Sequence, residues 1–138
     1  MLFRSTELTY QVRIPSFAKA AGNLLLLRLA LNDFADDIME HGERTQPIVF
    51  PSTTHETEIV EIALPDKYAV DELPPPVRID TAVASYESLT EVAGSLLRNT
   101  RQLEIKGLTV EKNRLGELKE FYRKVSASEA AAAVLKPR

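Results

Sequence analysis

The densest group of side chains that could do chemistry lies in a short acidic segment that ends in a histidine. Its members are Asp33, Asp36, Asp37, Glu40 and His41. In a helix, spacings of three and four would bring Asp33, Asp37 and either Glu40 or His41 onto one face, and carboxylates with an imidazole can bind a divalent cation. The segment lacks the spacing of an EF-hand, and clustered acidic residues usually form a solvated surface. Asp33, Asp37 and His41 are therefore weak candidates for a metal site, and no cofactor is expected.

The second histidine, His55, lies beside Thr54 and Glu56. A histidine close to a hydroxyl group can act as the base that activates this hydroxyl as a nucleophile. No nucleophile-elbow motif surrounds a serine, however, and no carboxylate pair is marked as an acid–base dyad by its spacing. We therefore expect no catalytic residue, and a surface position for His55. A pocket that joined His55 or His41 to a carboxylate and a serine would instead favour a small hydrolase.

Composition excludes several classes of function. The 138 residues carry a net charge of −3 and include no cysteine. The absence of cysteine excludes disulfides, thiolate metal sites and a cysteine nucleophile within this chain. The negative net charge does not indicate a basic surface that would bind nucleic acid. No apolar run is long enough to span a membrane. The first ten residues lack an apolar core segment, so we expect no signal peptide.

Alternating apolar and polar residues predict a chain made mainly of strands. The residues from Thr6 to Ile14 alternate and are followed by Pro15, which should end the strand. Val83 to Val92 and Ser95 to Ile105 alternate on both sides of Ala93-Gly94 and form the best hairpin candidate. Further strands are predicted at residues 24–31, 48–50, 59–64, 68–72 and 77–80. For residues 24–31 the pattern alone also fits a buried helix, and the short length and the preceding Gly22-Asn23 favour the strand.

Three consecutive prolines, Pro74 to Pro76, separate two of these predicted strands. Such a run favours a polyproline II conformation, which aromatic grooves can bind. Its place between two strands favours a rigid crossover from one sheet to another.

The period of the pattern changes near the C-terminus. Apolar residues from Leu115 to Val125 recur at spacings of three and four, so an amphipathic helix is predicted at about residues 113–128, with Asn113 as its N-cap. Its apolar face suffices for internal packing, although it could dock a partner. The alanines after Ser128 could extend the helix, or Val134 and Leu135 could form a short edge strand. The sequence thus predicts a single domain, residues 1–138, that is an antiparallel β-sandwich of about seven strands with one C-terminal amphipathic helix.

Several stretches together resemble a known pattern. They are Arg44 with Pro47, TEIVEIALPDKYAVDELPPPV, SYESLTEVAGSLLRNTRQLEI and LGELKEFYRKVSASEAAAAVLK. In this order and spacing they resemble the C-terminal β-sandwich domain of bacterial transglutaminase-like proteins. In those proteins the domain follows a β-rich N-terminal domain and a papain-like core.

The resemblance implies an accessory role. The chemistry of the family uses a Cys-His-Asp set in the core, and this chain has no cysteine, so no catalytic residue is carried over and no enzyme activity is expected. The implied partners are a transglutaminase-like core, in the same chain or a separate one, and its protein or peptide substrate. The implied location is extracytoplasmic, in the periplasm or at the cell surface. The alternative is a stand-alone peptide- or glycan-binding module.

Overall fold

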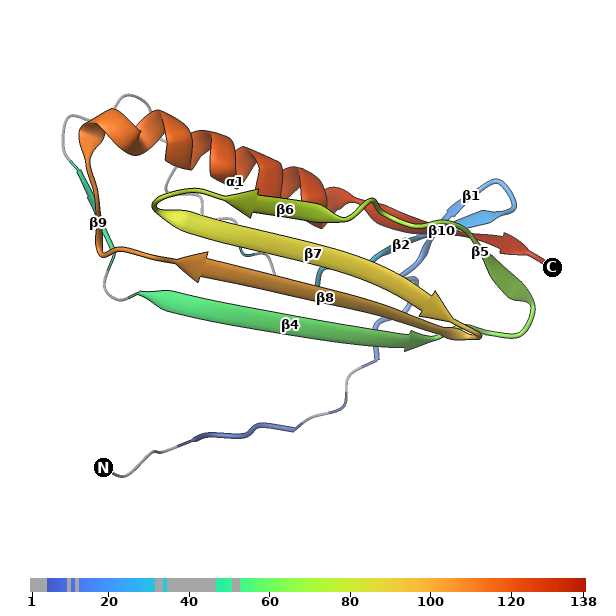
Figure 1. Ribbon diagram of the computed structural model, residues 1–138. Coiled ribbons are helices and arrows are strands. Elements are labelled where there is room, and N and C mark those ends of the chain that lie inside the picture. Colours follow the sequence, from blue (N-terminus) through green and yellow to red (C-terminus); the bar gives the residue numbers. More distant parts are fainter. Residues whose placement is uncertain (1–4, 10, 12, 32–33, 35–46, 51–52) are drawn as a thin grey trace.

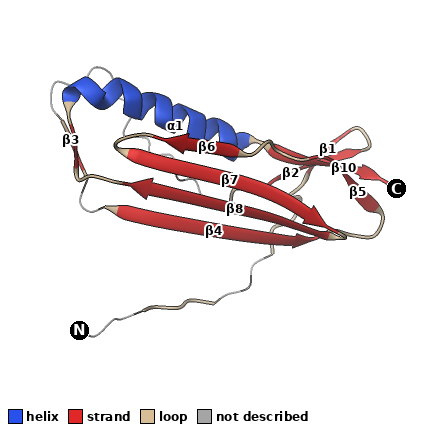
Figure 2. Ribbon diagram, in the orientation of Figure 1, coloured by secondary structure: helices blue, strands red, loops and turns tan. Residues whose placement is uncertain are grey.

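The computed structural model describes residues 5–9, 11, 13–31, 34, 47–50 and 53–138 (Figure 1). The predicted antiparallel, mainly β architecture with one C-terminal helix is confirmed: the described strands form two four-stranded antiparallel sheets and a two-stranded ribbon (Figure 2). The large sheet has the order β4-β8-β7-β6, the small sheet has the order β1-β2-β10-β5, and the ribbon pairs β3 with β9.

The large sheet consists of β4 (Thr54–Ala63), β6 (Val77–Asp80), β7 (Ala84–Ala93) and β8 (Leu96–Ile105). The predicted hairpin is present, and β7 pairs with β8 from Ala84↔Ile105 to Ala93↔Leu96. Gly94 has a φ of 60°, in the left-handed region, so the turn consists of Gly94 and Ser95. The alternation places Tyr86 and Leu103 on the inner face of the sheet, where both are buried.

The small sheet consists of β1 (Lys19–Ala21), β2 (Leu24–Arg28), β5 (Tyr68–Glu72) and β10 (Ala132–Pro137). The ribbon consists of β3 (Ile48–Val49) and β9 (Thr109–Val110). The three prolines lie between β5 of the small sheet and β6 of the large sheet. They therefore form the predicted crossover between sheets.

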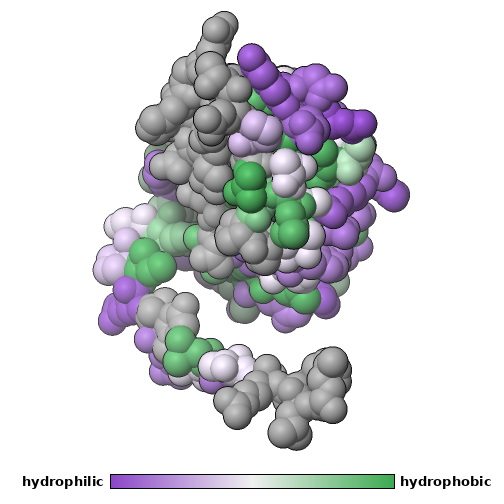
Figure 3. Space-filling model, turned by 90° about the vertical axis from the view of Figure 1, so that its left-hand side faces the viewer, coloured by the Kyte–Doolittle hydropathy of each residue, from purple (hydrophilic) through white to green (hydrophobic). Residues whose placement is uncertain are grey.

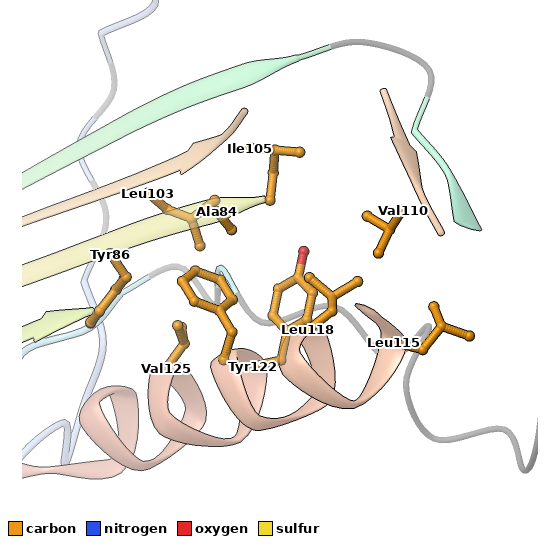
Figure 4. Close-up of a cluster of buried hydrophobic side chains, with 10 residues drawn as sticks. Ala84, Tyr86, Leu103, Ile105, Val110, Leu115, Leu118, Tyr122 and Val125 are labelled. Carbon is orange, nitrogen blue, oxygen red and sulfur yellow. The ribbon is translucent and has the colours of Figure 1, made fainter. Parts of the chain in front are cut away.

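The helix α1 (Leu115–Ala130) lies beside the large sheet and follows a 3₁₀ turn, η2 (Lys112–Arg114) (Figure 1). Its predicted apolar face is confirmed, and it packs on the sheet and on the ribbon in a first core (Figure 4). This core contains Ala84, Tyr86, Leu103, Ile105, Val110, Leu115, Leu118, Phe121, Tyr122 and Val125. The helix thus uses its apolar stripe for internal packing.

A second core fills the space between the two sheets. Its buried members are Leu27, Leu29, Leu64, Leu97, Ala133 and Leu135. The inner face of the large sheet is therefore covered by two different elements, by α1 over one half and by the small sheet over the other. Burial of a leucine or valine side chain stabilises the fold by roughly 1.5–3 kcal/mol.

Three local predictions are wrong. The described residues between Ser5 and Ile14 are exposed and form no strand, and they pair with none of the described strands. Asn113 lies inside the 3₁₀ turn, and the N-cap position is occupied by Arg114, which makes no side-chain cap bond. Of the two alternatives for the residues after the helix, the strand forms: the helix ends at Ala130 and β10 follows. Only its expected place is wrong, because β10 lies between β2 and β5 rather than at an edge.

Candidate functional site

The outer face of the large sheet places His55 in a row with other polar side chains. The strand register pairs His55 with Glu104, and Glu104 with Ser85, and Ser85 lies opposite Asp80. All four line a shallow hollow of about 250 Å³. This hollow joins His55 to carboxylates and a serine, which is the arrangement that would favour a hydrolase.

The order of the row differs from that of a catalytic triad. A triad needs the histidine between the nucleophile and the carboxylate, within hydrogen-bond distance of both. Here Glu104 on β8 separates His55 on β4 from Ser85 on β7. Neighbouring strands are about 4.8 Å apart, so the backbones that carry the histidine and the serine are roughly 10 Å apart. The side chains of His55 and Ser85 are not hydrogen-bonded to each other, and the row offers His55 no nucleophile to activate.

An ion pair closes one end of the row. The Lys106 ammonium group contacts the Asp80 carboxylate and donates a hydrogen bond to the carbonyl of Thr81, at 2.8 Å. Its hydrogen bond and its positive charge lower the pKa of Asp80 below the ordinary value. Asp80 is thus a charged, engaged carboxylate rather than a general acid.

A second group of charges lies inside the molecule, between the two cores. Arg101, on the inner face of β8, donates a hydrogen bond of 2.9 Å from Nη2 to Oε1 of Glu58 on β4. Its Nη1 atom lies 3.8 Å from Oε1 of Glu129 near the end of α1. The three side chains are 2%, 9% and 4% exposed, respectively. Ion pairs buried to this degree are strongly coupled, because little water screens them.

The cluster of Arg101, Glu58 and Glu129 also holds the segment that follows β2. The backbone N–H of Leu31 donates to Glu58, and the backbone N–H of Phe34 donates to Glu129. The Phe34 ring centroid lies 4.3 Å from the Arg101 guanidinium carbon, in a cation–π contact. The cluster therefore connects β4, β8 and α1 with Leu31 and Phe34, which follow β2.

The pKa of Arg101 shows which contacts dominate. Burial lowers the pKa of the Arg101 guanidinium, but the hydrogen bond to Glu58, the negative charge of Glu58 and the nearby Tyr86 together raise it above its ordinary value. Arg101 is permanently charged, cannot act as an acid or a base near neutral pH, and is enclosed. We interpret the cluster as a structural joint.

This cluster was missed at the level of sequence, although a signal was present. In β8 the inward positions alternate from Leu97 to Ile105, and Arg101 occupies one of them. A charged residue at a position that the alternation assigns to the core predicts a buried partner of opposite charge. The partner on α1 could not be located without the fold.

The predicted metal candidates Asp33, Asp37 and His41 lie outside the described residues, as does Arg44. Among the residues that the structure does describe, no group of three or more metal-ligating side chains is present. No described helix is long and apolar enough to cross a bilayer.

Comparison with known proteins places the fold in a family. Residues 22–135 match the model of a domain of unknown function for which a structure has been solved, DUF3858. This chain belongs to the DUF3858 family. The predicted resemblance to a domain family is thereby confirmed at this level, and the link to a transglutaminase core stays a prediction. No curated protein matches.

One solved structure shares the DUF3858 fold. It is the crystal structure of a "putative protease" from Parabacteroides distasonis ATCC 8503, with a TM-score of 0.68 and 9% sequence identity. The match covers 84% of this chain and 24% of that chain. At this identity the match shows the shared fold alone.

Proposed function

We propose that this DUF3858 chain is a non-catalytic accessory domain of a transglutaminase-like bacterial protein, and that it packs on or positions the papain-like core or the protein substrate of that core. The observation that carries the proposal is the size relation to the Parabacteroides protein. The match covers 84% of this chain but only 24% of a chain that is described as a "putative protease". A fold that occupies a quarter of a larger protein is well suited to act beside another domain.

The arrangement of polar groups supports a non-catalytic role. The charged cluster around Arg101 is buried and joins β4, β8 and α1. The exposed row around His55 has its serine and histidine on non-adjacent strands. Neither arrangement places a base next to a nucleophile.

Exposed apolar side chains support an interaction role. Val49 on β3 is 70% exposed and Leu108, just before β9, is 51% exposed. Figure 3 views the molecule from the end at which β3 pairs with β9 and shows apolar surface there. Such surface can be covered when a second domain packs against it.

Calorimetry with purified proteins tests the proposal. This chain is titrated into the transglutaminase-like core that we expect to be encoded upstream of it, and binding at micromolar or tighter affinity is expected. Replacement of Val49 and Leu108 by aspartate should weaken binding, whereas Ile59→Asp, on the outer face of the large sheet, serves as the matched control. An active, folded core that produces no binding heat with this chain would refute the accessory role.

A further inference from the structure

A groove runs between the strand β6 and the helix α1. It has a volume of about 770 Å³ and is lined on one side by residues 75–81 and on the other by side chains from the second half of α1. Figure 1 shows the helix running beside this strand. The groove is therefore bordered by a sheet edge and a helix, as are the sites of domains that bind peptides by strand addition.

The edge of β6 has unused backbone groups that face this groove. Among the described strands, β6 pairs with β7 alone. The N–H of Thr81 donates to the carbonyl of Ala84 at 2.9 Å and closes the ladder at the turn. Hydrogen-bonded and non-hydrogen-bonded pairs alternate along an antiparallel ladder, so Ile79 and Val77 also bond to β7. The N–H and C=O groups of Arg78 and Asp80 must then point toward the open edge.

The walls of the groove allow a backbone to approach closely. On the helix side they are formed by the small residues Ala127, Ser128 and Ala131, and on the strand side by the half-buried Val77 and Ile79. Small residues leave room for an added strand, and the two apolar residues offer a surface for its alternate side chains.

The charges along the groove select the partner. Three basic residues line it, Arg78, Arg123 and Lys124. Its acidic lining residue, Asp80, already contacts Lys106, and Arg123 is paired with Glu120. The lining therefore presents an excess of positive charge, which is complementary to acidic side chains.

From the open edge, the small residues and the charge, we infer that this groove binds an extended acidic segment of a protein, which adds to β6 as a further strand. The backbone groups of Arg78 and Asp80 hydrogen-bond to the segment. Carboxylates on the outer side of the added strand contact Arg78, and those on the side that faces α1 contact Lys124. This inference goes beyond the accessory role, because a peptide can bind to β6 whether or not a catalytic core is docked elsewhere.

Fluorescence anisotropy with two labelled octapeptides tests the charge selection. One repeats Val-Val-Glu-Glu and the other repeats Val-Val-Lys-Lys, so that each side of the added strand carries both apolar and charged residues. The acidic peptide should bind saturably and at least about tenfold more tightly than the basic one. Lys124→Glu should weaken binding of the acidic peptide by about tenfold, while Lys119→Glu, on the same helix but outside the groove, should leave it unchanged. Equal binding of the two peptides, or equal effects of the two variants, would overturn the inference.

Amide hydrogen exchange tests the mode of binding. Addition of the acidic peptide should slow exchange at the amides of Arg78 and Asp80, while the amides of Val77 and Ile79, already bonded to β7, should change less. Arg78→Pro removes an edge N–H that does not bond to β7, so it should weaken binding more than Arg78→Ala does. Protection that appears only at strands other than β6 would refute strand addition, even if the chain still bound a catalytic core.

Discussion

Arg101 and Glu58 form an ion pair across β8 and β4, with 2.9 Å between Nη2 and Oε1 and with 2% and 9% of the two side chains exposed. The pair lies between the core under α1 and the core under the small sheet. Arg101 is a charged residue on the inner face of β8, where Leu97 belongs to one core and Leu103 to the other. The two cores are thereby joined through hydrogen bonds rather than through one continuous apolar layer.

Arg101→Met should destabilise the protein strongly, because Glu58 and Glu129 would be left as buried carboxylates without their cation. Breaking a buried pair from one side costs roughly 3–5 kcal/mol in the free energy of unfolding. Urea denaturation followed by circular dichroism measures this loss. The exposed pair of Arg98 and Glu61 supplies the control: Arg98→Met should cost no more than about 1 kcal/mol. Similar losses for the two variants would show that the Arg101 cluster is not a structural joint.

The hydrogen bond between the Tyr86 hydroxyl and the Ser128 hydroxyl, 2.9 Å long, connects β7 to α1. Tyr86→Phe should lower the free energy of unfolding by about 1 kcal/mol, the usual net value of such a bond. A double-mutant cycle with Ser128→Ala isolates the contribution of this contact. If the losses of the two single variants simply add in the double variant, the two hydroxyl groups are not coupled.

The exposed N-terminal segment and the second core should respond very differently to truncation of a leucine. Leu97 is fully buried between the sheets, whereas Leu8 is 79% exposed. Leu97→Ala should cost about 2–5 kcal/mol through lost burial and a cavity, and Leu8→Ala should stay within about 0.5 kcal/mol of the wild type. Thermal and urea unfolding of both variants check this. A large loss for Leu8→Ala would mean that the predicted strand from Thr6 to Ile14 does form.

The ion pair of Asp80 with Lys106 predicts a pH dependence. The pKa of Asp80 is lowered from 3.8 by Lys106, so the pair stabilises the fold above pH 3.8, and this contribution disappears as the pH falls through the lower folded-state pKa. An NMR titration of the Asp80 carboxyl carbon should give a midpoint below 3.8. Lys106→Met should move the midpoint upward, whereas Lys112→Met should not. An unchanged midpoint in Lys106→Met would contradict the pairing.

Elements that depend on local pattern could be predicted from the sequence. The hairpin of β7 and β8 follows from the strict alternation of apolar and polar residues around Gly94, because one face of the sheet is exposed to solvent and the other is buried. The crossover at Pro74 to Pro76 follows from the missing N–H groups and fixed φ of proline. The apolar face of α1 follows from spacings of three and four.

Features that depend on distant residues could not be predicted in the same way. The residues of β10 include alanines that favour a helix and Val134 that favours a strand, and the choice is made by the free edges of β2 and β5. The segment from Thr6 to Ile14 has a good strand pattern, but a strand also needs a neighbour. Likewise, the contact of Arg101 with Glu129 joins positions 28 residues apart in sequence, and no local signal connects them.

The position of β10 has a consequence for the order of events during synthesis. This strand lies between β2 and β5 and pairs with both. The strands β2 and β5 therefore cannot be joined in one sheet until residues Ala132 to Pro137 have been synthesised. The hairpin of β7 and β8 is local and can pair early. On the ribosome, the large sheet can thus begin to form while β2 and β5 are not yet paired with β10. Their exposed edges are protected only after β10 has left the exit tunnel, which makes this interval the one in which a nascent chain most needs a chaperone.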